Sequence, residues 1–202
     1  MKRKASQLVV LQPSGFSLME LMIVMALIVI VAGLAAPNLI ERMKGNRVYS
    51  AADQVREVLS EARTYAIDSG IDYQFRYEPQ GQFFVILPTE QEPSTSNSVS
   101  TGSETSEYMR LSGQLDEDLL IQPMPDESDT IERLEPLWFG GLPDAGTLAT
   151  KSWSSPIYFR FDGSATDRRF RVTDPDGRTS ELSVRGLTGA VRMTPVYQEA
   201  QQ

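Results

Sequence analysis

The most unusual chemical group in this chain is the carboxyl group of Glu20. It is the only charged side chain in the 21-residue stretch from Phe16 to Ala36, and residues 21–36 carry no charge. A carboxylate costs about 2.5–3.5 kcal/mol at the middle of a bilayer and less near the interface. A plain membrane anchor has no use for a carboxylate at this position.

The composition excludes several other chemistries. The 202 residues include no cysteine and no histidine, which excludes disulfides, Cys/His zinc sites, thiolate nucleophiles and histidine acid–base relays. The net charge of −8 repels phosphate backbones and argues against a nucleic-acid partner. No Ser/Lys pair or carboxylate pair stands out from the background. We expect neither an enzyme nor a bound cofactor.

Two acidic segments are candidates for binding calcium. Asp174 and Asp176, followed by Gly177, could supply oxygen ligands, but an EF-hand-like loop would need a glutamate at its twelfth position, where this chain has Arg185. We therefore expect a turn at 174–177 and no metal site. The acidic run at 116–118 is interpreted either as a calcium-binding cluster or as a solvated charge run.

Tryptophan and arginine residues supply the remaining candidates. Trp138 and Trp153 are interpreted as parts of the core, with contact to a partner as the alternative. Arg168, Arg169 and Arg171 form a local basic patch. Its simplest interpretation is an exposed strand edge that charge protects from further pairing.

The element that must position Glu20 is a helix. Twenty-one helical residues span about 31 Å, close to the hydrocarbon thickness of about 30 Å, so residues 16–36 are predicted to cross a membrane once. Lys2, Arg3 and Lys4 place the N-terminus in the cytoplasm and the rest of the chain outside it. An ordinary signal peptide cut after the apolar stretch is disfavoured by Pro37 and stays as an alternative.

The helix should continue beyond the membrane through residues 37–70. Pro37 is expected to kink it, and Gly70 to cap its C-terminus. Apolar residues recur there at helical spacing, which predicts an amphipathic helix with one packed side. The predicted packed positions are Val48, Ala51, Ala52, Val55, Val58, Leu59, Ala62, Tyr65 and Ala66.

Residues 71–202 are predicted to form a β-rich head. Residues 73–77 and 82–87 read as a hairpin, and the Ser/Thr/Glu-rich segment 88–107 as a low-complexity loop. Near the C-terminus, frequent turn residues predict antiparallel pairing of consecutive strands. These strands are expected at 156–162, 169–173, 181–185 and 190–194. The predicted fold class is α+β, with a long N-terminal helix packed on an antiparallel sheet.

The N-terminal hexapeptide carries a specific resemblance. Gly15-Phe16-Ser17-Leu18-Met19-Glu20, after a short basic leader, resembles the class III signal peptide of type IV pilins and type II secretion pseudopilins. The resemblance implies that prepilin peptidase removes residues 1–15 by cutting between Gly15 and Phe16. It implies N-methylation of Phe16 and retention of the apolar stretch. It also implies that Glu20 neutralises the terminal amine of a neighbouring subunit during assembly.

The C-terminal third carries a second resemblance. Its strand order, with Phe161-Asp162-Gly163 and the final segment 187–191, is similar to GspH-type minor pseudopilins and FimT minor pilins. A pilin fold is implied, and with it a structural subunit of a type II secretion pseudopilus. The mature chain would have 187 residues, which favours a minor subunit over the major one.

The implied location is the inner membrane, with the head in the periplasm and the subunit later leaving the bilayer for the pseudopilus. The implied partners are other pseudopilins, inner-membrane secretion assembly proteins and prepilin peptidase. Two alternatives stay open. One is a minor type IV pilin of the FimT kind, and the other is a signal-anchored extracytoplasmic enzyme or binding domain.

Overall fold

The computed structural model describes residues 16–90 and 108–198, and of residues 35–42 it describes only the backbone. The predicted leader at 1–15 and most of the predicted loop at 88–107 lie outside these residues. The chain divides into two units, which we name the N-terminal unit (residues 1–43) and the head (residues 44–202).

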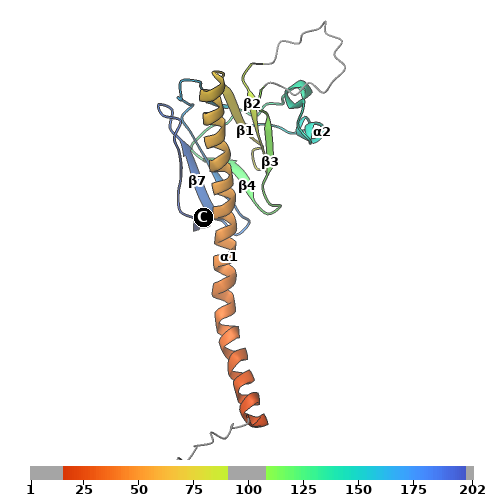
Figure 1. Ribbon diagram of the computed structural model, residues 1–202, viewed down its shortest axis with the longest axis vertical. Coiled ribbons are helices and arrows are strands. Elements are labelled where there is room, and N and C mark those ends of the chain that lie inside the picture. The colour runs from red at the N-terminus through yellow and green to blue at the C-terminus, as the bar shows by residue number, and fades with distance from the viewer. Residues whose placement is uncertain (1–15, 91–107, 199–202) are drawn as a thin grey trace, which may run out of the picture. The chain divides into compact units, whose positions relative to one another are not determined.

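One long helix, α1 (Leu18–Ser69), runs through the first third of the chain (Figure 1). It ends as predicted at Gly70, whose φ of +73° suits a residue without a Cβ atom. The amide of Gly70 donates to the carbonyl oxygen of Ala66 at 3.1 Å. Pro37 lies inside α1, and the kink there stays a prediction.

The head contains two antiparallel sheets, whereas the sequence predicted one. The first has the strand order β3-β2-β1-β5; the second has the order β4-β6-β7-β8, with β9 also paired to β7. The strands of the first sheet are β1 (Tyr73–Tyr77), β2 (Phe83–Pro88), β3 (Leu111–Gln114) and β5 (Ile157–Phe159). Those of the second are β4 (Leu120–Pro123), β6 (Arg168–Thr173), β7 (Arg178–Val184), β8 (Val191–Met193) and β9 (Tyr197–Gln198).

Several predicted pairings are confirmed. β1 and β2 form the expected hairpin, closed where Tyr77 lies opposite Phe84. β6, β7 and β8 pair in sequence order, as the turn residues between them predicted. The predicted α+β fold, a long N-terminal helix followed by antiparallel sheet, is confirmed.

The pairing predicted between the strands at 156–162 and 169–173 is wrong. β5 pairs with β1, where Phe75 lies opposite Ile157, and β6 pairs with β4 and β7. Only a single bridge, between Phe159 and Ala165, links the end of β5 to the following turn. At this turn the chain passes from the first sheet to the second. β5 belongs to the first sheet because it pairs with β1, which is distant in the sequence.

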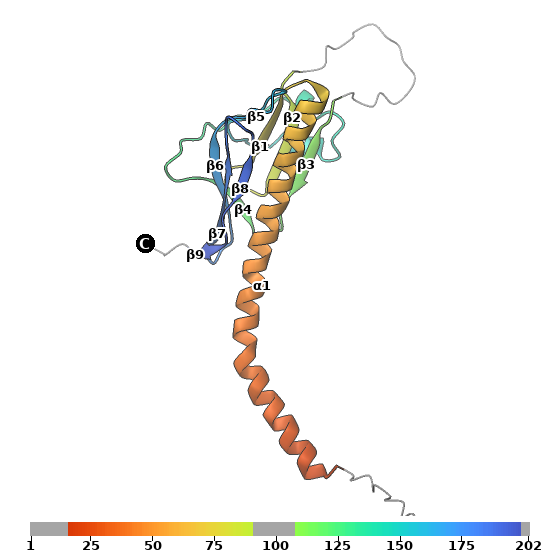
Figure 2. The same cartoon turned by 60° about the vertical axis from the view of Figure 1, so that its left-hand side comes forward.

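The main core lies between α1 and both sheets. The predicted stripe of α1 is buried there against Phe75, Phe159, Phe170 and other apolar residues of the strands. Tyr65 is an exception: it was predicted to pack but is 45% exposed. Figure 2 shows the part of α1 that belongs to the head lying alongside its strands.

A second, smaller core covers the other face of the first sheet. The 3₁₀ helix η1 (Pro136–Phe139) and the short helix α2 (Ala145–Leu148) carry the side chains that build it. Phe139, Leu148 and Trp153 pack there against Val85 and Leu87 of β2. Since both faces of the first sheet are covered, every residue of β1 is buried.

Candidate functional site

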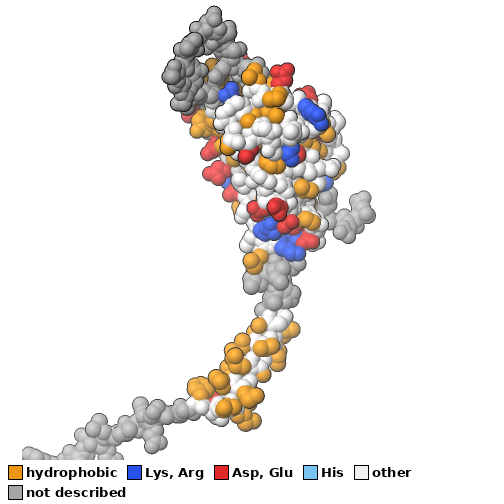
Figure 3. Space-filling model, turned by 90° about the vertical axis from the view of Figure 1, so that its right-hand side faces the viewer, with side chains coloured by type: hydrophobic (Ala, Val, Ile, Leu, Met, Phe, Trp, Pro, Cys, Tyr) orange, Lys and Arg blue, Asp and Glu red, His pale blue; other side chains and the backbone are white. Residues whose placement is uncertain are grey.

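Within the described part of the N-terminal unit, the helix from Leu21 to Leu34 carries apolar side chains on all sides. Its large hydrophobic side chains between Phe16 and Leu34 are 41–78% exposed, and Figure 3 shows hydrophobic side chains along the visible face of this stretch of helix. Such a surface is stable only where other apolar groups cover it. Among the residues whose side chains are described, no helix is both long enough and apolar enough to cross a membrane.

Glu20 is the acidic residue in the first turn of α1. The helix begins with a hydrogen bond from the amide of Leu21 to the carbonyl oxygen of Ser17, at 3.1 Å. A negative charge in this turn interacts favourably with the helix dipole. The structure therefore places the exposed Phe16 and Glu20 at the same end of α1. Gly15 lies outside the described residues.

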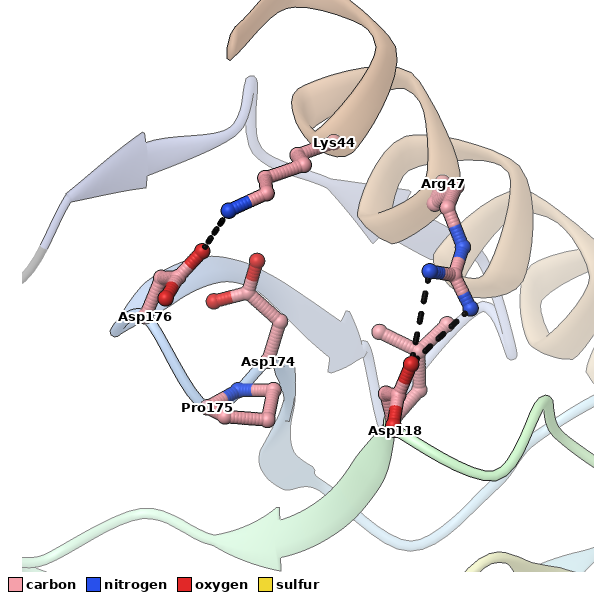
Figure 4. A pocket seen from close by; sticks show the side chains of 7 residues that line it. Lys44, Arg47, Asp118, Asp174, Pro175 and Asp176 are labelled. Atoms are coloured by element: carbon pink, nitrogen blue, oxygen red, sulfur yellow. Dashed lines mark hydrogen bonds and ion pairs between the residues drawn. The ribbon is translucent and has the colours of Figure 1, made fainter. Parts of the chain in front are cut away.

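At the first turn of α1 within the head, cations of the helix meet acidic loops around an open pocket. Lys44, Arg47, Asp118, Leu119 and residues 174–176 line it. Lys44 Nζ lies 2.7 Å from Asp176 Oδ2, and both terminal nitrogens of the Arg47 guanidinium lie 3.4 Å from Asp118 Oδ2 (Figure 4). Side chains of opposite charge thus face one another across the pocket.

The 174–177 segment is the turn that the sequence predicted. Arg178 Nη1 donates to Asp174 at 2.9 Å and to Asp176 at 2.8 Å, and Gly177 takes a φ of +80°. The hydrogen bond from Lys44, together with that from Arg178, holds the pKa of Asp176 below its ordinary value. Both carboxylates are therefore bound by the protein's own cations.

The acidic run at 116–118 is exposed and pairs with Arg47. Arg47 lies 3.6 Å from Asp116 and 3.4 Å from Asp118, and all three side chains are about half or more exposed. Such pairs contribute little stability in water. Within the described residues, no group of three or more carboxylates is arranged to hold a metal ion.

The interpretation of the patch as an exposed strand edge is wrong for Arg171, which lies opposite Gln122 of β4. Arg168 and Arg169 pair with β7 on one side and lie beyond the end of β4 on the other. Arg168 Nη2 lies 2.7 Å from Asp129, and Arg169 Nη2 lies 2.5 Å from Asp126. The acidic segment before β5 thus neutralises the charges of Arg168 and Arg169. The sequence did not predict these ion pairs because the partners are far apart in the chain.

Sequence reasoning missed a buried polar network between the two sheets. The hydroxyl of Tyr77 on β1 donates to Asp129 Oδ2 at 2.8 Å, and Arg168 of β6 donates to Asp129 Oδ1 at 2.7 Å. The amide of Ser155 donates to the same carboxylate at 2.8 Å. Burial, assisted by Asp129, raises the pKa of Tyr77. The sequence holds no local signal for this network because its members come from distant segments.

The two tryptophans behave as core residues. Trp153 is fully buried, and its indole N–H donates to the carbonyl oxygen of Leu148 at 3.3 Å. Trp138 packs half-buried on the same cluster. The interpretation of both as parts of the core is confirmed.

The comparisons with known proteins first identify a sequence motif in the N-terminal segment. Residues 13–36 match the prokaryotic N-terminal methylation motif, which confirms the resemblance drawn from the hexapeptide at 15–20. In the family that the sequence resembles, a dedicated peptidase processes and methylates proteins with this kind of N-terminus. No curated protein sequence matches the chain significantly.

Particular solved structures are similar to this chain. One is the minor pseudopilin EpsH from the type II secretion system of Vibrio cholerae, with 15% identity, a TM-score of 0.44, and coverage of 74% of this chain and 97% of that chain. Another is the type IV minor pilin FimU of Pseudomonas aeruginosa, with 16% identity, a TM-score of 0.41, and coverage of 76% and 95%. A second EpsH structure gives 15% identity, a TM-score of 0.43, and coverage of 77% and 98%.

Proposed function

We propose that this chain is a structural minor pseudopilin of a type II protein secretion system. Prepilin peptidase would cut between Gly15 and Phe16 and methylate the new N-terminus, and the mature subunit would assemble into a periplasmic pseudopilus. The observation that carries the proposal is the methylation motif at 13–36, placed at the start of a helix whose side chains from Leu21 to Leu34 are all apolar and exposed.

The exposed surface of the N-terminal unit supports a role in assembly. Side chains such as Leu18, Ile23 and Ile30 are more than half exposed. A continuous surface of this kind needs a covering of lipid or of other helices. A subunit that leaves the inner membrane for a helical bundle would find the first covering before assembly and the second afterwards.

Glu20 is proposed as the residue that registers one subunit against the next. Its carboxylate lies among Met19, Leu21 and other apolar side chains on α1. A buried carboxylate is tolerable only with a cation beside it, and the methylated amine of Phe16 in a neighbouring subunit is a cation at the required end of the helix. Other pseudopilins and inner-membrane assembly proteins would be the partners.

The proposed location follows from the leader. Lys2, Arg3 and Lys4 would keep the N-terminus in the cytoplasm, where the peptidase acts in the resembled family, and the head would lie in the periplasm. The membrane segment proposed is residues 16–36, crossing once until assembly withdraws it.

Intact mass and N-terminal sequencing of the membrane-extracted protein test the proposal. We expect a mature chain that begins with N-methylated Phe16. Replacing Gly15 with leucine should leave an uncleaved precursor, whereas the same change at Ala5 within the leader should leave processing normal. A mature terminus near Asn38, or normal processing of Gly15→Leu, would refute the proposal.

Substitution of Glu20 separates processing from assembly. Glu20→Gln removes the charge and keeps the size of the side chain, so the variant should be cleaved and methylated but should fail to enter the pseudopilus. Glu20→Asp keeps the charge and should retain part of the assembly. Normal assembly of Glu20→Gln would contradict the proposed charge pairing.

A minor type IV pilin of the FimT kind is the alternative favoured by the same motif and by the C-terminal strand order. Deletion of the gene decides between them: a secretion defect supports the pseudopilin, and a defect in twitching or pilus assembly supports the pilin. A signal-anchored binding domain or enzyme would instead keep its activity after removal of residues 1–45.

A further inference from the structure

One edge of the first sheet is open. Within the described residues, β3 is the outermost strand of this sheet and pairs only with β2 (Figure 1). The amide of Leu115, the residue after β3, donates to the carbonyl oxygen of Gln82 at 3.0 Å. Because hydrogen-bonded and non-bonded residues alternate along an antiparallel strand, residues 111, 113 and 115 bond to β2, and Ser112 and Gln114 direct their amide and carbonyl groups outward. No residue of 16–90 or 108–198 bonds to these four outward groups.

The chain itself closes two of the other three edges of the sheets. On β5, the amide of Thr166 donates to the carbonyl oxygen of Tyr158 at 2.9 Å, and the amide of Tyr158 donates to Thr166 Oγ1 at 3.3 Å. On β4, the amide of Gln80 donates to the carbonyl oxygen of Ile121, and the amide of Ile121 donates to the carbonyl oxygen of Gly81, both at 2.8 Å. The turns that follow β5 and β1 therefore occupy hydrogen-bonding groups of these two edges.

The remaining edge, β8, is protected in a way that β3 is not. β8 carries the exposed Arg192 and is followed closely by Pro195, which has no amide hydrogen. Charged residues and proline are the usual protection of an edge strand. The sequence of β3, Leu111–Gln114, contains neither. Among the described edges, β3 is therefore the one best suited to accept another strand.

The side chains of β3 specify which kind of strand it accepts. Leu111 and the preceding Met109 pack half-buried on the main core. Side chains alternate along a strand, so the polar side chains of Ser112 and Gln114 lie on the opposite face. A segment laid beside β3 would place apolar side chains next to Leu111 and polar side chains next to Ser112 and Gln114. An extended segment of alternating apolar and polar residues fits this edge.

We propose that an extended segment of this alternating kind, from another subunit of the assembly, pairs with β3 as an additional strand of the first sheet. This inference rests on the proposed function, because it names a partner of the assembled subunit. The four outward groups can form at most four hydrogen bonds, each of modest strength in water, which do not offset the cost of bringing two separate molecules together. A neighbouring subunit held in the same helical bundle is already close, so its segment would act at a high effective concentration.

Two nearer candidates fit the edge poorly. Residues 91–107 precede β3, but Val99 is their only aliphatic residue, and one such side chain does not provide an alternating segment. A second copy could pair antiparallel through its own β3, but the head segment of α1 lies alongside the strands (Figure 2), so these segments would point in opposite directions in the two copies. Such a pair does not suit two anchors in one membrane. A parallel pair would turn one copy over and set its polar face beside the apolar face of the other.

Hydrogen exchange of the full-length protein tests the pairing. The amides of Ser112 and Gln114 should exchange fast in the unassembled protein, solubilised in detergent, and slowly in assembled pseudopili. The amide of Gly113 bonds to β2 and should exchange slowly in both samples, so it is the internal control.

Proline substitutions test whether the outward amides matter. Ser112→Pro removes one of them and leaves the hydrogen bonds between β2 and β3 in place. It should lower incorporation into pseudopili about tenfold, because the lost hydrogen bond and the added ring both oppose pairing. Ser112→Ala is the matched control: it keeps the amide and should be incorporated like the wild type. Gln114→Pro repeats the test at the second amide, and thermal unfolding of each full-length variant shows whether it folds.

Three results would overturn the inference. The first is fast exchange of both amides in pseudopili. The second is slow exchange of both in the unassembled protein: at every concentration it would show that the chain itself covers the edge, and only at high concentration it would assign the edge to a second copy. The third is normal incorporation of folded Ser112→Pro and Gln114→Pro. With Phe16 as the methylated N-terminus, each result would leave the proposed function intact, whereas a mature chain that does not begin at Phe16 would refute that function itself.

Discussion

The amino group of Lys44 lies 2.7 Å from the Asp176 carboxylate, which joins the first turn of α1 in the head to the turn between β6 and β7. At the other end of β7, the turn that contains Gly189 packs on Arg63. Lys44 and Arg63 are about 29 Å apart along the helix at the usual rise, and the seven residues of β7 span about 23 Å. β7 and its two turns therefore contact α1 near both ends of its head segment.

The Lys44–Asp176 pair predicts a loss of stability in acid. The pKa of Asp176 is lowered in the folded chain by Lys44 and Arg178, so its contribution is present above the unfolded pKa of about 3.9 and is lost as the pH falls through the folded value. Thermal unfolding followed between pH 5 and pH 2 should therefore show a smaller acid-dependent loss in Asp176→Asn. Asp144→Asn, which removes an acid that makes no cap hydrogen bond at α2, is the control for loss of one carboxylate. Equal slopes for wild type and Asp176→Asn would contradict this account.

The buried network around Asp129 predicts a large effect of a single substitution. Asp129→Ala removes the partner of Tyr77 and the 2.7 Å partner of the mostly buried Arg168, and it should lower the free energy of unfolding by about 3–5 kcal/mol. Tyr77→Phe removes one hydrogen bond and should cost about 1 kcal/mol. Urea unfolding followed by tryptophan fluorescence measures both. If Asp129→Ala lowers the free energy of unfolding by less than Tyr77→Phe does, the network does not join the sheets.

Ionisation of Tyr77 is expected to lower the stability of the fold in alkali. Burial raises its pKa in the folded chain, so its contribution is complete below the unfolded pKa of about 10 and disappears as the pH rises above that value. Wild type should be destabilised between pH 10 and pH 12 more than Tyr77→Phe is, when unfolding is followed at each pH. Phenolate absorption at pH 11 provides a second measurement. If it shows that all the tyrosines of the folded chain ionise together, the prediction is contradicted.

The backbone at Gly189 adopts a conformation that favours glycine, and the neighbouring residues in the sequence do not indicate this. Its φ is +58°, and an added Cβ atom would approach the Gly163 carbonyl oxygen to 2.7 Å, so Gly189→Ala should lower the free energy of unfolding by about 1–3 kcal/mol. Gly146→Ala is the matched control, because Gly146 lies in α2 with open space around it. It should stabilise the chain by up to about 1 kcal/mol. Thermal unfolding of the two variants in parallel checks the difference in sign.

The sequence predicted elements more reliably than their partners. The period of 3.6 residues located the buried stripe of α1, and the turn residues located β1, β2, β6, β7 and β8. The pairing of β5 was predicted wrongly because β5 finds its partner in β1, about 80 residues earlier. No turn signal reports such a contact. Tyr65 was placed in the core by its spacing, but the side chain lies at the border of the buried stripe.

The candidate assembly residues were accessible from the sequence because their chemistry is local. Gly15, Phe16 and Glu20 lie within six consecutive residues, and the methylation motif depends on that order and on the apolar run that follows. The ion pairs of Arg47 and Arg168 combine residues that are far apart in the chain. Only the tertiary structure could decide them, because each arises where packing of α1 and two sheets brings distant turns together.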